Sequence, residues 1–158
     1  MNYLAHIYLS GTQMELRFGN FIADAVPGKQ YAVYAKGIQE GILLHRAIDT
    51  FTDQHPLFRK HCKLLFPDFE HYSRVIIDMF YDHFLASLWH NYHPQTLEKF
   101  SDDFYNEIDQ QKALLPHKMK RAFPYMKEQN WLIQYKSIAG LETILSQMER
   151  RTQFESNL

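Results

Sequence analysis

Polar residues recur four apart along this chain, inside segments whose other residues are largely apolar. The pairs are Asn20 and Asp24, His45 and Asp49, and Asp78 and Asp82. Residues four apart share one face of an α-helix. Nearly all of the apolar periodicity is near 3.6 residues, and no segment shows the sustained alternation of a strand. The sequence therefore predicts an all-α, single-domain helical bundle, with sites where helices face one another.

Proline and glycine divide the chain into its expected helices. Residues 2–10 are expected to form a short helix or a strand, and residues 13–25 a helix that ends at Pro27-Gly28. Further helices are expected over residues 31–52, 57–66, 70–92, 95–113, 117–127 and 137–151. The 57–66 helix should end before Pro67. The 70–92 helix is apolar nearly all round, so we expect it at the centre of the bundle.

Composition excludes several classes of protein. Hydrophobic residues make up 46% of the chain, enough for a substantial core, and the formal net charge of −1 argues against nonspecific nucleic-acid binding. No apolar stretch reaches the roughly 18 residues of a membrane span, and the N-terminus lacks signal-peptide features. The single Cys62 excludes an internal disulfide. We expect a cytoplasmic protein with no membrane partner, and the oligomeric state stays open.

The paired acids and histidines indicate a divalent-metal site built from several helices. Burying a charge is costly unless the charge is paired or binds a metal. Asp78 and Asp82 on one helix face would repel each other, and their pKa values would rise unless a cation lay between them. Imidazole and carboxylate ligands suit Mn²⁺, Fe²⁺, Zn²⁺ or Mg²⁺. The alternative interpretation is a set of buried salt bridges to arginine or lysine.

Residues next to these pairs carry further candidate roles. The planar fork of Arg46 suits phosphate oxygens, and its alternative is an ordinary ion pair. His83 is a metal ligand, a residue that orients a carboxylate, or a core histidine. Asp53 either joins the site or caps the helix that follows it. Gly37 and Gly41 either let another helix come close, which we favour, or leave space for a substrate.

Two runs of charge have opposite signs. Residues 98–109 are strongly acidic, whereas residues 117–127 carry four basic residues and no acid. A solvated helix face is the ordinary interpretation of both runs. The more specific alternative is that an acidic protein partner docks on the basic residues of 117–127.

Four blocks of sequence, taken in order, resemble one protein family. The blocks are MNYLAHIYLS, GNFIADAVPGK, GILLHRAIDTFTDQHP and DMFYDHFLASLW. They are similar to the acyl carrier protein phosphodiesterases, bacterial enzymes that hydrolyse the 4′-phosphopantetheine arm from holo acyl carrier protein. The resemblance implies a divergent, rearranged HD-type phosphohydrolase, all-helical and dependent on a metal, usually Mn²⁺, with Mg²⁺ or Fe²⁺ as alternatives. It is strong over residues 1–93 and thin beyond them.

The resemblance also implies roles for individual residues. The implied metal ligands are Asp24, His45, Asp49, Asp78 and Asp82. The implied catalytic residues are Asp24, Arg46, Asp82 and His83. The implied substrate contacts are His6, Asn20, Lys29, Arg46 and Asp53. In such a mechanism Arg46 or Lys29 would stabilise the negative charge that develops on the phosphate.

The chain departs from the family pattern in two places. Ala25 and Pro27 stand where the family usually has an aromatic and a basic residue, which would alter the mouth of the site. The chain also ends sooner than its relatives, which continue through another helical segment after the region matching MERRTQF.

Carrier proteins are acidic, so candidate docking cations are the 117–127 run or Arg17, Lys29 and Lys36.

Two other functions stay open at this point. One is a metal-dependent phosphohydrolase acting on a nucleotide or another small phosphate ester, and the other is a non-catalytic helical binding protein. The chain contains no GxGxxG, Walker, HExxH, GxSxG or CxxC motif. That absence weighs against dinucleotide binding, P-loop chemistry, zincin proteolysis and α/β-hydrolase chemistry.

Overall fold

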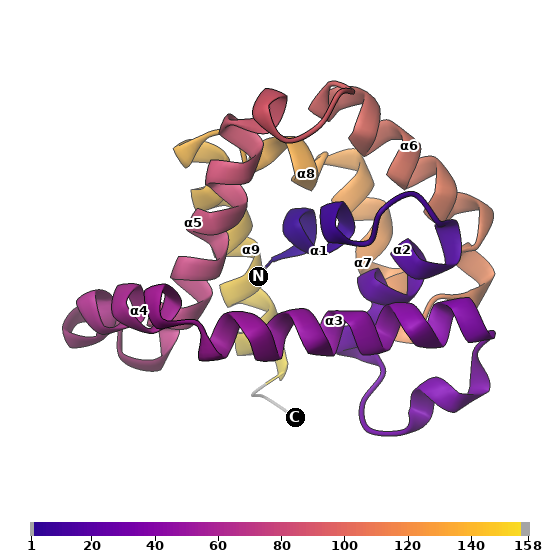
Figure 1. Cartoon of the computed structure of the whole chain (residues 1–158), viewed down its shortest axis with the longest axis horizontal. Helices are drawn as coiled ribbons and strands as arrows, with labels where there is room; N and C mark the ends of the chain where they lie inside the picture. The colour runs from indigo at the N-terminus through magenta and orange to yellow at the C-terminus, as the bar shows by residue number, and fades with distance from the viewer. Residues whose placement is uncertain (1, 156–158) are drawn as a thin grey trace.

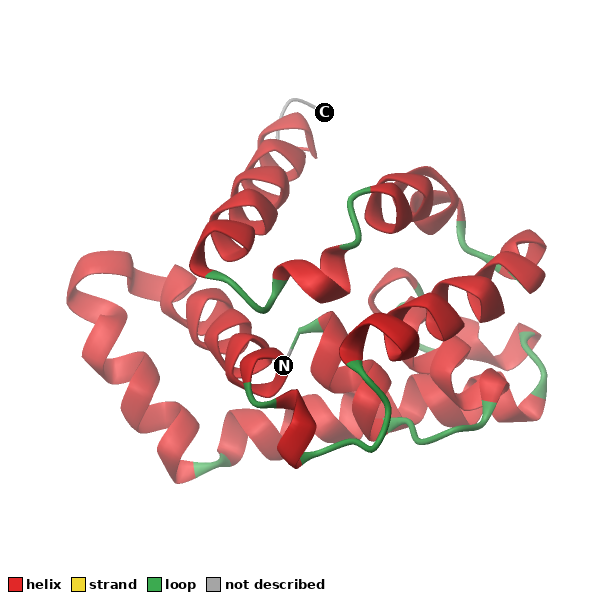
Figure 2. Cartoon of the chain, turned by 90° about the horizontal axis from the view of Figure 1, so that it is seen from above, coloured by secondary structure: helices red, strands yellow, loops and turns green. Residues whose placement is uncertain are grey.

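The computed structural model describes residues 2–155, and side chains are described for residues 2–148. Every regular element in this range is helical, which confirms the all-α prediction (Figure 1, Figure 2). The α-helices are α1 (Tyr3–Leu9), α2 (Met14–Ile22), α3 (Lys36–Gln54), α4 (Pro56–Phe69), α5 (Ser73–Ser87), α6 (Leu97–Gln110), α7 (His117–Glu128), α8 (Trp131–Gln134) and α9 (Ile138–Glu155). The 3₁₀ turns are η1 (Ala23–Ala25), η2 (Gln30–Val33), η3 (Glu70–Tyr72), η4 (Trp89–Asn91) and η5 (Lys112–Leu114). None of these described helices is both long enough and apolar enough to cross a membrane.

The N-terminal segments follow their sequence pattern closely. Residues 2–10 form a helix, α1, and not a strand. The expected helix over 13–25 becomes α2 followed by the tight turn η1, which carries Asp24. Gly28 then takes a φ of 57°, a left-handed conformation that glycine adopts without strain. The chain can therefore turn away after α2 and enter α3 from a loop.

The expected end of the 57–66 helix is wrong, because α4 continues through Pro67 to Phe69. Pro67 lacks a backbone N–H, so the carbonyl of Lys63 loses its helical partner. Lys63 is exposed, and water can replace that missing hydrogen bond. A proline inside a solvent-facing helix therefore costs less than the sequence pattern suggested.

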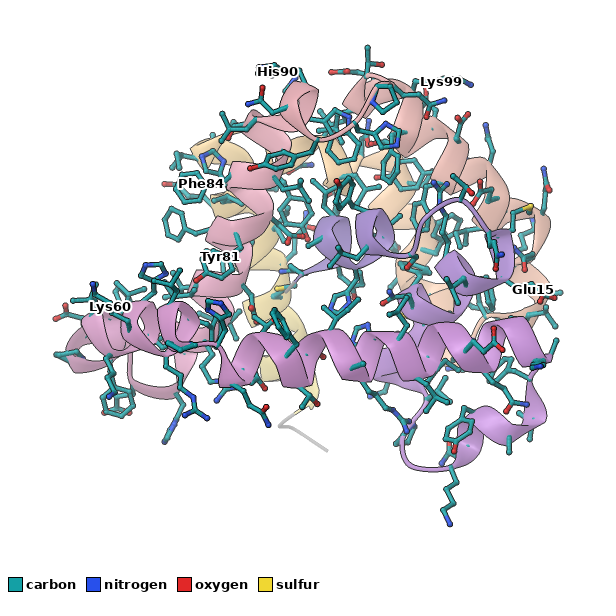
Figure 3. All side chains as sticks on the ribbon, viewed as in Figure 1. Glu15, Lys60, Tyr81, Phe84, His90 and Lys99 are labelled. Atoms are coloured by element: carbon teal, nitrogen blue, oxygen red, sulfur yellow. The ribbon has the colours of Figure 1, made fainter. Side chains whose placement is uncertain are left out.

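The single helix expected over 70–92 is divided into η3, α5 and η4. Glu70 takes a φ of 49° where the chain turns from α4 into α5. The helix is also less central than its composition indicated, because Phe80 is 36% exposed and Phe84 is 54% exposed. Figure 3 shows Phe84 pointing away from the bundle. An apolar pattern indicates that a helix face is favoured in a buried position. In the described part of the chain, one apolar face of α5 is nevertheless exposed to solvent.

Helices α2 and α3 cross with their backbones in close contact at two glycines. A Cβ atom at Gly19 would collide with the carbonyl of Ile38, and one at Gly41 would collide with the carbonyl of Leu16. The sequence favoured a packing role for Gly41, and the structure supports it. This crossing brings the end of α2 against the middle of α3, which is where the polar pairs of both helices lie.

The core is formed by apolar side chains from both halves of the chain. Its fully buried members include Leu4, Ile7, Phe18, Ile22, Ile42, Phe104, Leu132 and Ile144. The sequence did not predict α8, whose Trp131 and Leu132 are buried. Four helical residues are too few to show a period, so this element has no sequence signal of its own.

We expect Gly41→Ala to destabilise the protein. Alanine has the higher helix propensity by about 1 kcal/mol. The collision with the α2 backbone should outweigh this gain and give a net loss of about 1–3 kcal/mol, because backbone atoms cannot step aside as a side chain can. Urea unfolding followed by circular dichroism measures the change. Gly37→Ala is the matched control, since its Cβ would meet the exposed Glu15 side chain, and its loss should be smaller. Equal stability of Gly41→Ala and the original protein would contradict the close crossing.

Candidate metal centre

Four polar side chains from three elements meet between α1 and α3. They are His6 from α1, Asp24 from η1, and His45 and Asp49 from α3. The Nε2 atom of His6 lies 3.0 Å from Oδ1 of Asp49. The Nε2 atom of His45 lies 3.2 Å from Oδ1 of Asp24 and 3.2 Å from Oδ2 of Asp49. Asp49 therefore lies between two imidazoles, and His45 lies between two carboxylates.

Asn20 fixes the orientation of the His45 ring. The amide nitrogen of Asn20 donates to the carbonyl of His6 and to Oγ of Ser10, which leaves its Oδ1 facing His45. Nδ1 of His45 lies 3.0 Å from that Oδ1 and 3.0 Å from the Asn20 carbonyl oxygen. Both oxygens accept, so Nδ1 carries the proton. In the neutral ring Nε2 then presents a lone pair to two carboxylates, which is repulsive unless a proton or a metal cation lies among them.

His6 stacks on His45 and contributes a second imidazole. The two rings are nearly parallel, 10° apart, with centroids separated by 3.8 Å. The Nδ1 atom of His6 is buried without a hydrogen-bond partner in the described structure. Burial lowers the pKa of His6, so the ring is neutral at pH 7. A neutral imidazole is the form that binds metals.

The other three groups share one strong electrostatic pattern. Burial opposes the charge of His45, but hydrogen bonds to Asp24 and Asp49 outweigh it and raise the pKa of His45 to about 9. Burial also opposes the charge of Asp49, yet hydrogen bonds from His45 and His6 hold its pKa well below the usual range. The hydrogen bond from His45 lowers the pKa of Asp24. The carboxylates are therefore ionised and ready to hold a cation.

A small cavity lies beside these side chains. It measures ≈80 Å³ and is lined by Asn2, Tyr3, His6, Asn20, Phe21, Asp24, His45 and Met148. This is room for an ion and one or two waters, since a water occupies about 30 Å³ of the liquid. The side chain of Asp24 is 77% exposed and that of Asp49 is 41% exposed, so the carboxylate side of the group faces solvent.

These residues fit a divalent cation. His6, His45 and Asp49 each offer a ligand atom, and the three atoms lie within 4.8 Å of one another. Among the side chains that the structure describes, no other three histidine, cysteine or acidic residues come this close. The mixture of imidazole nitrogen and carboxylate oxygen suits Mn²⁺, Fe²⁺, Zn²⁺ or Mg²⁺. His6 offers a ligand atom to this group, whereas the sequence had indicated a substrate contact.

Asp82 is not part of this group. It is fully buried on α5, where its Oδ2 accepts from the Ala5 amide at 3.1 Å and its Oδ1 accepts from the Asn2 amide at 3.3 Å. Amides in the first turn of a helix have no partner within the helix. Asp82 therefore caps α1, the helix that carries His6. The sequence predicted a metal ligand and catalytic residue here, but the structure directs both oxygens to backbone donors.

Three other predicted site residues lie outside the group of His6, His45 and Asp49. Nδ1 of His83 donates to the carbonyl of Tyr135 at 2.8 Å. Asp53 forms an exposed ion pair with Arg74 at 2.6 Å, and the cap of α4 is His55, not Asp53. Asp78 is half-buried on α5; burial raises its pKa, and the negative charge of Asp49 adds to the rise. Asp78 thus lies within electrostatic reach of the group without belonging to it.

The remaining predicted residues lie around the group. Asn20 is fully buried and orients His45, a different role from the substrate contact that the sequence predicted. Arg46 donates to the Val26 carbonyl at 2.8 Å, and its guanidinium lies over the Tyr31 ring. Lys29 is exposed in the loop that follows Asp24.

Sequence reasoning missed the apolar walls of the cavity. Met148 comes from α9, far along the chain from every block that indicated the site. Phe21 and Tyr3 read as ordinary core residues, and they pack on each other with ring centroids 5.8 Å apart. No motif marks these three residues, because an apolar side chain against a metal site looks the same in sequence as one in the core.

We expect metal binding to depend on pH through His45. With a pKa of about 9, His45 carries a proton at pH 7 in the metal-free protein, and a metal must displace it. The apparent affinity for Mn²⁺ should therefore rise about tenfold per pH unit from pH 7 towards pH 9. Calorimetric titration in buffers of different ionisation enthalpy should report about one proton released per ion at pH 7. Binding without proton release would contradict the assignment.

We expect Asp82 to make stability fall as pH rises. Burial raises the pKa of Asp82 to about 7 from 3.8 in the unfolded chain. Between these values the folded state holds the proton more tightly than the unfolded state, so the contribution of Asp82 to stability is full below 3.8 and is lost as the pH rises to about 7. Asp82→Asn should flatten this part of the profile, measured by urea unfolding across pH. Asp103→Asn, at a partly exposed position on α6, is the control, and an unchanged slope in Asp82→Asn would show that Asp82 does not titrate in this range.

Comparison with known proteins adds an independent observation. A family model described as acyl carrier protein phosphodiesterase matches residues 1–158. A protein of that name from Photorhabdus laumondii is 31% identical over 152 residues, which cover 96% of this chain and 77% of the relative. Proteins of the same name from Pectobacterium atrosepticum and Yersinia pestis are 30% identical, each over 96% of this chain and 79% of the relative. No solved structure matches the chain, so the HD-type arrangement stays a prediction. The chain belongs to the acyl carrier protein phosphodiesterase family.

Proposed function

We propose that this protein is a metal-dependent phosphodiesterase that removes 4′-phosphopantetheine from holo acyl carrier protein. The proposed metal ligands are His6, Asp24, His45 and Asp49, and Mn²⁺ is the proposed ion. One observation carries the proposal: Nε2 of His45 is directed between two ionised carboxylates, and a divalent cation can replace the proton that this nitrogen otherwise carries. The names of the relatives support the substrate.

The chain's own residues would bind and orient the ester. A divalent ion at this position supplies Lewis acidity and lowers the pKa of water from 15.7 to about 7. Asp24 has the most exposed carboxylate of the group and is therefore placed to accept a proton at the open side. Asn20 keeps the ligand nitrogen of His45 directed at the group, and Asp82 keeps α1, with His6, in place.

Arg46 is the proposed phosphate contact. A guanidinium has five N–H donors, and the only hydrogen bond described for Arg46 uses one of them on the Val26 carbonyl. The ring of Tyr31 lies 5.3 Å from its guanidinium carbon, so the side chain is held while donors remain. Arg46 follows the ligand His45 in α3, which places it beside the group.

The loop after Asp24 is the proposed docking region for an acidic carrier protein. The bond to be broken joins the arm to a serine of the carrier protein, so the carrier surface itself has to reach the site. Lys29 and Lys36 are exposed on this loop and at the start of α3, close in sequence to Asp24. Arg17 is not available, because it is 6% exposed and pairs with Glu107 at 3.2 Å.

The test is release of the arm from holo acyl carrier protein, followed by mass spectrometry after incubation with Mn²⁺. We expect the original protein to release phosphopantetheine. Asp49→Ala and His45→Ala should lower the rate by more than about 100-fold, beyond the 10–100-fold loss typical of residues that only support a ligand. Asn20→Ala should fall within that smaller range. Asp103→Ala removes a partly exposed member of an ion pair on α6 and should leave the rate unchanged.

The same experiment separates the alternatives. Turnover of a nucleotide panel without turnover of holo carrier protein would favour another phosphohydrolase. Failure to bind Mn²⁺, together with no activity on any ester, would favour a non-catalytic binding protein. Full activity of folded Asp49→Ala would exclude this group as the metal centre.

A further inference from the structure

A second and larger pocket lies between the end of α6 and α7. It is separate from the group of His6, Asp24, His45 and Asp49, which we call the metal group. It measures ≈770 Å³ and is lined by Asp109, Lys112, Ala113, Leu115, Lys120, Phe123, Pro124, Lys127 and Glu128. None of these residues lines the small cavity beside His6. Small-molecule sites usually measure about 300–1,000 Å³. The pocket is therefore large enough for an organic ligand of its own.

The inner wall of the pocket is apolar. Leu115 and Phe123 are each 4% exposed, so their side chains are held by the core beneath the pocket. Phe123 packs against Phe21 and Tyr105, which fixes the position of its ring. Lining residues 120, 123, 124, 127 and 128 follow helical spacing, so a single face of α7 forms one side. The core packing therefore holds this wall in place, and an apolar chain could lie against it.

The charges of the pocket leave an excess of positive charge. Lys127 pairs with Asp109 across the gap between α7 and α6. Lys112 and Lys120 are exposed, and neither forms an ion pair within the described part of the chain. Because Asp109 is paired with Lys127, Glu128 is the one remaining acid in the lining to balance the charges of these two lysines. An anionic group next to the apolar wall would therefore meet two ammonium groups.

We propose that this pocket binds an amphipathic anion, a linear apolar chain that ends in a carboxylate. The chain would lie on Leu115 and Phe123, and the carboxylate would lie between Lys112 and Lys120. The metal group cannot take such a molecule in the same way, because its exposed atoms belong to the carboxylates of Asp24 and Asp49. The proposal concerns binding at a separate pocket and does not depend on the phosphodiesterase activity.

Calorimetric titration with sodium decanoate tests the proposal. Decyltrimethylammonium has the same chain with the opposite charge, and acetate has the head group alone; both should bind at least about fivefold more weakly than decanoate. The double variant Lys112→Met/Lys120→Met should weaken decanoate binding by about fivefold, the weight of one or two exposed ion pairs. Arg121→Met is the matched control, because Arg121 is exposed on α7 but does not line the pocket.

Filling the pocket gives a second test that spares the core. Ala113 is exposed, so Ala113→Phe should fold normally, as circular dichroism can verify, while its ring occupies the space of the chain. This variant should lose decanoate binding and keep its affinity for Mn²⁺. Decanoate binding that survives Ala113→Phe, equal binding of the cationic analogue, or no binding of decanoate at millimolar concentration would each overturn the proposal.

Discussion

The close crossing of α2 and α3 is the constraint on which the rest of the structure depends. Gly19 and Gly41 let two backbones meet where any side chain would hold them apart. Only at that separation can the side chain and the carbonyl of Asn20 both reach Nδ1 of His45. The orientation of the His45 ring thus depends on Gly19 and Gly41, two residues that have no side chain. A small shift between these helices would weaken the contacts of Asn20 with Nδ1 and so loosen the orientation of the His45 ring.

A second connection ties the group to the other half of the bundle. Asp82 receives backbone amides from α1, and α1 in turn presents His6 to Asp49. Asp82 and Ala5 are 77 residues apart in sequence. The Asp82 side chain therefore both caps α1 and connects this helix to α5. The metal group is therefore supported from two sides. Asn20 orients one imidazole, and Asp82 places the helix that bears the other.

Sequence reasoning predicted the fold class and most of the helices, because 3.6-residue periodicity reports directly on local structure. It also placed His45 and Asp49 on one face of a helix, because residues four apart share a face, and the family resemblance added Asp24. It could not say which of several such pairs converge. Asp78 and Asp82 have the same spacing and a similar apolar setting, yet α5 turns Asp82 towards the amides of α1. That outcome depends on the angle between helices, which no local pattern records. The reversal at Glu70, the short α8 and the wall provided by Met148 were missed for the same reason.

The lining of the small cavity spans almost the entire chain, from Asn2 to Met148. A ribosome delivers residues at about 5–20 per second, N-terminal first. His6, Asp24, His45 and Asp49 are all synthesised early, several seconds before α9 adds Met148 to the cavity wall. During that interval any available cation could enter and leave freely. Met148 of α9 would then complete the apolar wall of the cavity, while the carboxylates of Asp24 and Asp49 stay open to solvent.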